Sequence, residues 1–95
     1  MQFVSKPITP IGAYDVEAMS HGEPSLPAAF RFENEELAVA TLVRSWRSTK
    51  DDRGDTYLKR HWFEFQTHDG RLAVVYFDRS ARRNAPRWWL YTLSS

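Results

Sequence analysis

The sequence predicts a mainly β fold: a small antiparallel meander of about five strands, curled into a half-barrel or small barrel. After position 28, short runs that alternate apolar and polar residues are separated by turn residues. Asp69-Gly70 lies between two such runs and favours a hairpin with a type I′ turn, which needs positive φ at both turn positions. No stretch after position 28 shows helical periodicity, so a helical fold is disfavoured.

The first 27 residues are expected to form an irregular or short-helical N-terminal arm, and residues 28–95 to form the β domain. Residues 1–27 hold four of the five prolines and two of the four glycines. Proline lacks a backbone N–H and restricts the residue before it, so no long regular element is expected there. The apolar residues of the arm are expected to pack on the domain.

The first two expected strands are separated by a short turn. Residues 28–33 form the first strand, and the turn follows at Asn34-Glu35 because Asn tolerates left-handed backbone angles. Residues 36–48 form the second strand, which is long and rich in β-branched residues. Its apolar register slips between Val39 and Leu42, and this slip predicts a β-bulge.

Three further strands complete the expected sheet. Residues 57–68 alternate, so Trp62 and Phe63 face opposite sides of the sheet. Residues 71–79 are apolar on both faces, which indicates a central strand, and residues 87–93 close the meander. The two apolar faces need two covers, and we expect the curled sheet to be one and the arm to be the other.

Length and composition exclude several classes of protein. The chain has 95 residues, enough for one domain around one core. It contains no cysteine, which excludes disulfides, thiolate catalysis and cysteine-ligated zinc. No apolar run approaches the ~20 residues that cross a bilayer, and the first residues lack the features of a signal peptide. We therefore expect a cytoplasmic domain with no membrane partner.

The charges are balanced in total but not along the chain. Thirteen basic and twelve acidic residues give a net charge of +1, so overall charge does not predict binding to nucleic acid. Residues 1–43 carry two basic and six acidic residues, whereas residues 44–95 carry eleven basic and six acidic ones. Either the basic part is a binding surface, or the acidic part lies across it within the same domain.

No group of residues predicts catalysis or a metal site. His61 and His68 fall on one expected strand but on opposite faces, so they are poor joint ligands. The acidic loop at residues 51–55 lacks the longer pattern and terminal Glu of a calcium-binding loop. Gly54 and Gly70 stand alone and form no phosphate-binding loop. We expect a domain that is not an enzyme and that uses no cofactor.

The remaining pattern combines arginine with aromatic residues on strands that the meander brings together. Single-strand nucleic-acid binders use exposed Trp to stack bases and Arg to contact phosphates. The alternative is structural, since Trp in a small domain is usually part of the core and Arg covers apolar surface with its stem. Trp88 and Trp89 face opposite sides, so one of them lies on the outer face unless the arm covers it.

If nucleic acid is the ligand, we expect Arg82 and Arg83 to contact phosphates and Trp62 to stack a base. The expected nucleic-acid contacts are Arg60, Trp62, Arg82, Arg83 and Arg87. The wider group of arginines and tryptophans that the meander gathers also includes Arg44, Trp46, Arg47, Arg79 and Trp88.

An ordered series of motifs runs through the domain. It consists of Trp46-Arg47, Arg60-His61-Trp62-Phe63, Asp69-Gly70, Tyr76-Phe77-Asp78-Arg79 and Arg87-Trp88-Trp89-Leu90-Tyr91. Over about residues 24–93 the chain resembles a family of short bacterial proteins classed as a domain of unknown function. Related-looking segments lie at the C-terminus of some proteins that resemble Y-family DNA polymerases. The resemblance implies a small β domain with a link to DNA repair or replication, and it supplies no catalytic residues.

Two kinds of binding partner follow from these observations. The first is nucleic acid or a DNA-processing protein, bound by a non-catalytic module. The alternative is a protein-interaction module that docks a peptide on a sheet edge or associates with a second copy of the chain. The oligomeric state stays open.

Overall fold

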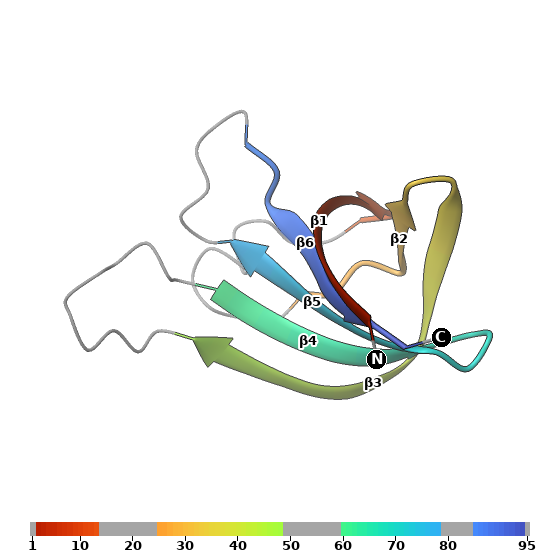
Figure 1. The fold of residues 1–95 in the computed structure, drawn as a ribbon. Helices are drawn as coiled ribbons and strands as arrows, with labels where there is room; N and C mark the ends of the chain where they lie inside the picture. The colour runs from red at the N-terminus through yellow and green to blue at the C-terminus, as the bar shows by residue number, and fades with distance from the viewer. Residues whose placement is uncertain (1, 14–24, 49–59, 79–84, 95) are drawn as a thin grey trace, which may run out of the picture.

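The computed structural model describes residues 2–13, 25–48, 60–78 and 85–94, which form six β-strands and no helix (Figure 1). The strands are β1 (Gln2–Ile11), β2 (Ala29–Phe32), β3 (Glu35–Ser48), β4 (Arg60–Thr67), β5 (Leu72–Asp78) and β6 (Trp88–Leu93).

Each strand pairs antiparallel with the next strand along the chain, and β6 pairs with β1 to close a barrel (Figure 1). Closure leaves no terminal strand in the strand order, although β2 pairs with β3 only as far as Ala38 among the described residues. The prediction of an all-β, antiparallel small barrel is confirmed. The number of strands is six rather than about five, because a strand lies in the region expected to be an arm.

That additional strand is β1, and it corrects the expectation of an irregular N-terminal segment. Residues up to Ile8 pair with β6, and from Thr9 onward the strand pairs with β2. The strand has an irregularity between Phe3 and Lys6, where Ser5 has a φ of 51°. Prolines are tolerated in such a strand because bulges and changes of partner remove the need for every N–H in the ladder. Residues 14–24 of the expected arm lie outside the described residues.

The long strand β3 changes its pairing partner along its length. Its residues up to Ala38 pair with β2, and from Val39 onward it pairs with β4. The register shifts twice, between Val39 and Thr41 and between Leu42 and Arg44, so the predicted bulge is confirmed. These irregularities allow one strand to bend and change partner.

The turn between β2 and β3 falls one residue earlier than expected. Phe32 pairs with Glu35, so Glu33 and Asn34 form the turn. The positive φ, 55°, is at Glu33 and not at the Asn expected to supply it. Positive φ at the first of two turn residues is the pattern of a type II′ hairpin turn.

The predicted hairpin at Asp69-Gly70 is present, but its type I′ turn is wrong. Only Gly70 has a positive φ, of 89°. The backbone N–H of Gly70 donates to the carbonyl of Thr67 over 3.0 Å, and the N–H of Thr67 donates to the carbonyl of Arg71 over 2.8 Å. These bonds describe a three-residue loop that ends in a left-handed glycine, the second common form of β-hairpin.

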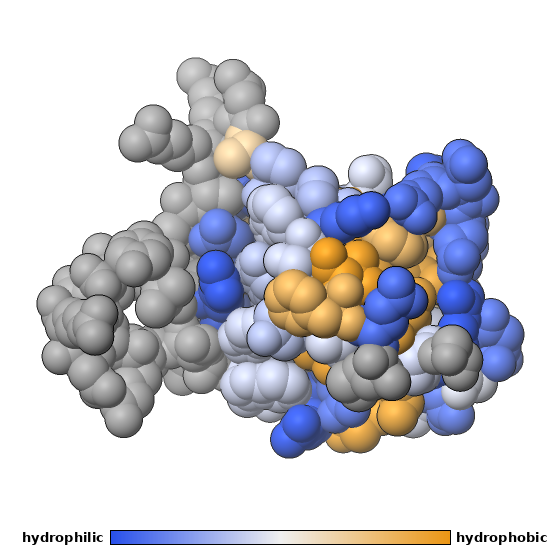
Figure 2. All heavy atoms as spheres, in the orientation of Figure 1, coloured by the Kyte–Doolittle hydropathy of each residue, from blue (hydrophilic) through white to orange (hydrophobic). Residues whose placement is uncertain are grey.

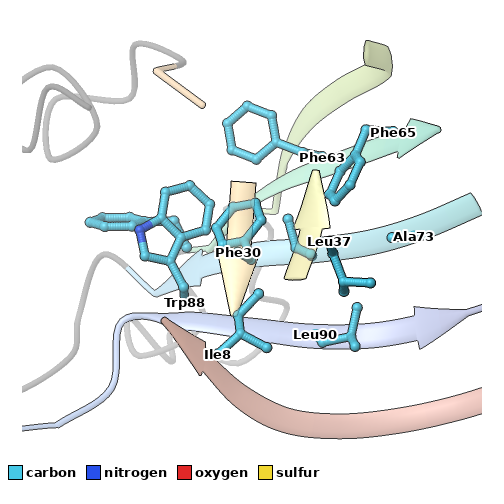
Figure 3. Packing of buried hydrophobic residues seen from close by; sticks show 10 residues of the cluster. Ile8, Phe30, Leu37, Phe63, Phe65, Ala73, Trp88 and Leu90 are labelled. Atoms are coloured by element: carbon cyan, nitrogen blue, oxygen red, sulfur yellow. The ribbon is translucent and has the colours of Figure 1, made fainter. Parts of the chain in front are cut away.

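The inward-facing side chains of all six strands meet in one core (Figure 3). Phe30 lies at its centre, with ring centroids 5.9 Å from Phe65 and 5.0 Å from Trp88. The alternation expected along residues 57–68 is confirmed for the described residues of β4, since Phe63 and Phe65 are fully buried while Trp62 faces outward and is half-buried. Residues 57–59 lie outside the described residues. The buried cluster consists of Ile8, Phe30, Leu37, Phe63, Phe65, Ala73, Val75, Phe77, Trp88 and Leu90.

Candidate nucleic-acid interface

The outer face of the barrel carries a continuous group of aromatic side chains from five strands. We call this group the aromatic platform. It consists of Phe3, Trp46, Trp62, Tyr76, Trp89 and Tyr91.

Four members of the platform form a row across β3, β4, β5 and β6. Trp46 pairs with Trp62, Trp62 pairs with Tyr76, and Tyr76 pairs with Trp89 in the strand register. Residues directly opposite each other on adjacent strands point to the same face, so their rings meet. The ring centroids of Trp46 and Trp62 are 5.8 Å apart with planes at 2°, and those of Tyr76 and Trp89 are 6.2 Å apart at 6°. Such parallel rings are offset, since full overlap would bring them closer.

Tyr91 extends the platform over β5. Its ring lies 5.1 Å from that of Trp62 at 85°, although β5 separates their two strands. On its other side, the ring of Phe3 lies 5.0 Å away at 84°. Tyr76 is therefore a buried centre of the platform, with 6% of its surface exposed, whereas Tyr91 and Phe3 are 37% and 64% exposed. The three tryptophans of the platform are half-buried.

Arginines lie against the platform. The guanidinium carbon of Arg44 is 4.6 Å from the ring centre of Trp46, and that of Arg60 is 4.5 Å from the ring centre of Tyr76. These are cation–π distances. Arg44 also donates from Nε to Glu64 over 2.7 Å, whereas Nε of Arg60 has no hydrogen-bond partner among the described residues.

The surroundings of Tyr76 keep its hydroxyl group protonated. Burial raises the pKa of Tyr76, because the phenolate is disfavoured away from water. The positive charge of Arg60 opposes this rise, while Asp78 and Tyr91 add to it. Tyr76 therefore contributes a neutral ring to the platform at physiological pH.

The structure describes three of the five residues predicted to contact nucleic acid and brings two of them, Arg60 and Trp62, together on one face. Arg60 and Trp62 share the outer face of β4. Arg87 directly precedes β6, and its guanidinium lies 5.9 Å from the ring centre of Phe77, at the same end of the strands as Arg60. Arg82 and Arg83 lie outside the described residues, as do Arg79 and the side chain of Arg47.

Trp88 does not belong to the surface group in which sequence reasoning placed it. It is 1% exposed and lies in the core, so Trp89 is the member of this pair that faces outward. The inward position follows from alternation along β6, where Trp88 and Leu90 share the core face.

Sequence reasoning missed Tyr76, Tyr91 and Phe3 as members of the platform. The signal for Tyr76 was the hairpin at Asp69-Gly70, but the expected two-residue turn sets Trp62 opposite Phe77. Only the observed three-residue loop sets Trp62 opposite Tyr76. The approach of Tyr91 to Trp62 had no such signal, since it depends on an irregularity in the pairing of β5 with β6 after Val74.

Figure 2 shows the surface of this side of the molecule. A band of pale side chains, of intermediate hydropathy, crosses the sheet between an orange hydrophobic patch and blue hydrophilic surface. The hydropathy values of Trp and Tyr are intermediate, because each ring is apolar but carries a polar N–H or O–H group. A surface made of these residues is therefore not coloured as hydrophobic.

The buried histidine of β4 has structural contacts. His61 is 3% exposed, its Nε2 lies 3.0 Å from the hydroxyl oxygen of Ser45, and its ring stacks on Phe63. No three His, Asp or Glu residues are grouped to hold a metal ion in the described ranges. No helix long and apolar enough to cross a membrane occurs there either.

A cavity of about 330 Å³ lies at one end of the barrel, lined in part by Phe3 and Phe32. Its charged residues are paired: Lys6 lies 3.3 Å from Glu33, and Arg71 lies 2.7 Å from Glu35. The cavity thus has no free charge to attract an ionic ligand.

Comparison with known proteins gives a family but no function. A family model described as a domain of unknown function (DUF6504) matches residues 1–95 of the chain. No curated protein and no solved structure matches the chain.

Proposed function

Because the chain belongs to the DUF6504 family of domains of unknown function, we propose its role from its surface: a non-catalytic module that binds single-stranded nucleic acid on the aromatic platform. The observation that carries the proposal is the in-register row of Trp46, Trp62, Tyr76 and Trp89, with guanidinium groups against two of its rings. Unpaired bases stack on such rings and on Arg planes, and each stacked base contributes about 1–3 kcal/mol.

The shape of the site favours unpaired nucleic acid over a duplex. In a duplex the faces of the bases are stacked on one another and cannot reach a protein ring. Duplex recognition in the major groove uses an α-helix or a two-stranded ribbon that enters the groove. The row of Trp46, Trp62, Tyr76 and Trp89 instead lies across four strands of a curved sheet. Its three tryptophans are only half-buried, and such rings suit bases that have left the stack.

The resemblance to segments of Y-family polymerase-like proteins supports a role beside DNA repair or replication proteins. Such complexes expose single-stranded DNA. A small module that holds unpaired bases fits this setting without any catalytic residue of its own.

Titration of Trp fluorescence with oligonucleotides tests the proposal. We expect a single-stranded oligonucleotide to change the fluorescence and a duplex of equal length to bind more weakly. Trp62→Ala is expected to weaken binding by about 5- to 150-fold, which corresponds to the loss of one stacked base. Leu42→Ala is the matched control, since Leu42 is an exposed apolar residue of β3 outside the platform. Absence of binding tighter than about 100 μM at low salt, where the electrostatic contribution is largest, would reject the proposal.

A second candidate function is favoured by the free edge of β3. Among the described residues, β2 pairs with β3 only as far as Ala38, and Leu42 and Val43 are 46% and 52% exposed. An extended apolar peptide would add to this edge through main-chain hydrogen bonds and cover these two side chains. Chemical-shift changes along β3 on addition of a synthetic Val-rich strand peptide would support this candidate, and unchanged shifts there would exclude it.

A further inference from the structure

We infer, on the basis of the proposed function, that the bound strand crosses β3 to β6 with its bases over the platform and its phosphates on the side of Arg60 and Arg87. The row of Trp46, Trp62 and Trp89 runs from strand to strand, at right angles to the chain direction of the sheet. Bases that follow this row therefore lead the nucleic acid across the strands rather than along one of them.

The row has two flanks, which the strand register defines. On one flank, Arg60 pairs with Asp78, and the carbonyl of Arg87 accepts a hydrogen bond from the N–H of Asp78 over 2.7 Å. We call this the Arg60–Arg87 flank. On the opposite flank, Arg44 pairs with Glu64, and we call this the Arg44–Glu64 flank.

The two flanks differ in whether their arginines form ion pairs with a carboxylate. The guanidinium of Arg44 lies 2.7 Å from a carboxylate oxygen of Glu64, whose side chain is only 15% exposed. Arg60 and Arg87 form no ion pair with a carboxylate of the described residues.

Among the residues that the structure describes, Asp78 is the acidic residue of the Arg60–Arg87 flank, so two arginines are set against one carboxylate in this part of the chain. On the other flank one arginine faces one carboxylate. A phosphate therefore gains more on the Arg60–Arg87 flank, because on the other it would compete with Glu64 for Arg44.

This arrangement also sets how strongly binding depends on salt. With two phosphate contacts on a single strand, the slope of log K against log salt is expected to be about −1.4, since each contact contributes about −0.7. Most of the affinity then comes from stacking, which salt affects little.

A matched pair of variants tests the position of the phosphates. Arg87→Gln and Arg44→Gln each remove one charge, the first from the Arg60–Arg87 flank and the second from the Arg44–Glu64 flank, and keep most of the apolar stem. Binding of a labelled single-stranded oligo-dT, followed by anisotropy over a range of salt concentrations, gives the slope for each protein. We expect Arg87→Gln to reduce the magnitude of the slope by about 0.7 and the affinity by about five-fold at ~0.1 M salt. Arg44→Gln is expected to leave the slope unchanged.

Two controls accompany this pair. Arg31→Gln removes an exposed arginine of β2, away from the platform, and should bind as the unaltered domain does. Arg87→Lys keeps the charge and should restore the slope, which separates loss of a phosphate contact from loss of structure.

The outcomes distinguish the path of the strand from the proposed function itself. If oligo-dT binds but Arg44→Gln reduces the slope and Arg87→Gln does not, or if both reduce it equally, the inferred path is wrong and nucleic-acid binding stands. If the unaltered domain does not bind oligo-dT, both the path and the proposed function are overturned.

Discussion

Asp69 holds the β4–β5 hairpin through its own loop. It accepts a hydrogen bond from the hydroxyl group of Thr67, and its other carboxylate oxygen lies 3.0 Å from Arg71. The hydrogen bond from Thr67, followed by that from Arg71, lowers the pKa of Asp69 below its ordinary value of 3.8. A carboxylate with a lowered pKa in the folded state stabilises the fold above the pKa of the unfolded chain.

We therefore predict that Asp69→Asn lowers the melting temperature at neutral pH, and that this difference shrinks as the pH falls below about 4. At low pH the carboxylate of the original protein is itself protonated and its advantage is lost. Thermal unfolding followed by circular dichroism from pH 2 to pH 7 measures the difference. Glu36→Gln, which changes an exposed carboxylate of β3, serves as the control. A difference that stays constant over this range would contradict the prediction.

Glu33 has a backbone conformation that suits glycine better than an L-residue, with φ at 55°. This conformation costs an L-residue about 1–2 kcal/mol, and the greater freedom of unfolded glycine offsets about half of the gain from replacing it. Glu33→Gly is therefore expected to raise the free energy of unfolding by about 0.5–1 kcal/mol, measured in urea. The lost contact to Lys6 is between exposed groups and adds little. Glu36→Gly, at a regular strand position, should lower stability instead; a loss in both variants would show that φ at Glu33 is not the cause.

Tyr76 offers a spectroscopic view of the platform centre. Because burial raises its pKa and the positive charge of Arg60 opposes that rise, removal of the charge should raise the pKa further. We predict that Arg60→Gln shifts the ionisation of Tyr76 to higher pH. The difference in tyrosinate absorbance between each protein and its Tyr76→Phe counterpart isolates this group. Arg44→Gln should leave the titration unchanged, and a shift of equal size there would indicate a general effect of net charge.

At the scale of elements, β1 is the strand that the sequence did not predict, and its core residue shows how much it stabilises the fold. Ile8 is 6% exposed and belongs to the core cluster. Ile8→Ala is expected to cost about 2–4 kcal/mol in the free energy of unfolding, as for other buried aliphatic residues. Thr9→Ala, at an exposed position of the same strand, should cost much less. Similar small losses in both variants would mean that β1 packs only loosely.

The strands after residue 28 were predictable because alternation and turn residues agree there. Phe63 and Phe65 identify one face of β4, and Gly70 supplies the positive φ that the hairpin needs. β1 was missed since Pro7 and Pro10 outweighed its apolar residues, and local sequence does not reveal that a bend and a change of partner accommodate them. Tertiary context decides such strands.

The candidate site was predictable only in part for a related reason. Alternation puts Trp88 and Trp89 on opposite faces of the sheet, but it does not tell which face of a barrel is the inside until a core partner is known. Arg44 could be recognised as basic, whereas its neutralisation by Glu64 depends on the register after two bulges in β3. Pairing across bulged strands is thus the limit of the sequence argument here.

At the scale of the whole molecule, the platform reports on closure of the barrel, because its six rings come from five strands. We predict that the near-ultraviolet circular dichroism of these rings is lost in the same transition as the far-ultraviolet signal of the strands. Small domains with one core unfold in such a single step. A platform signal that disappears at lower denaturant concentration would show instead that the β3–β6 face loosens before the barrel opens.

The pairing of β1 with β6 can form only late during synthesis of the domain. Gln2 lies opposite Leu93, so the contacts that seal the barrel join residues from the two ends of the described chain. Contacts of such long sequence separation form slowly, because the chain entropy between them is lost before they stabilise anything. On the ribosome, β1 leaves the exit tunnel before the other five strands and has no partner on its β6 side until almost the whole domain has been synthesised. Until then its unpaired edge is available to chaperones or to other nascent chains.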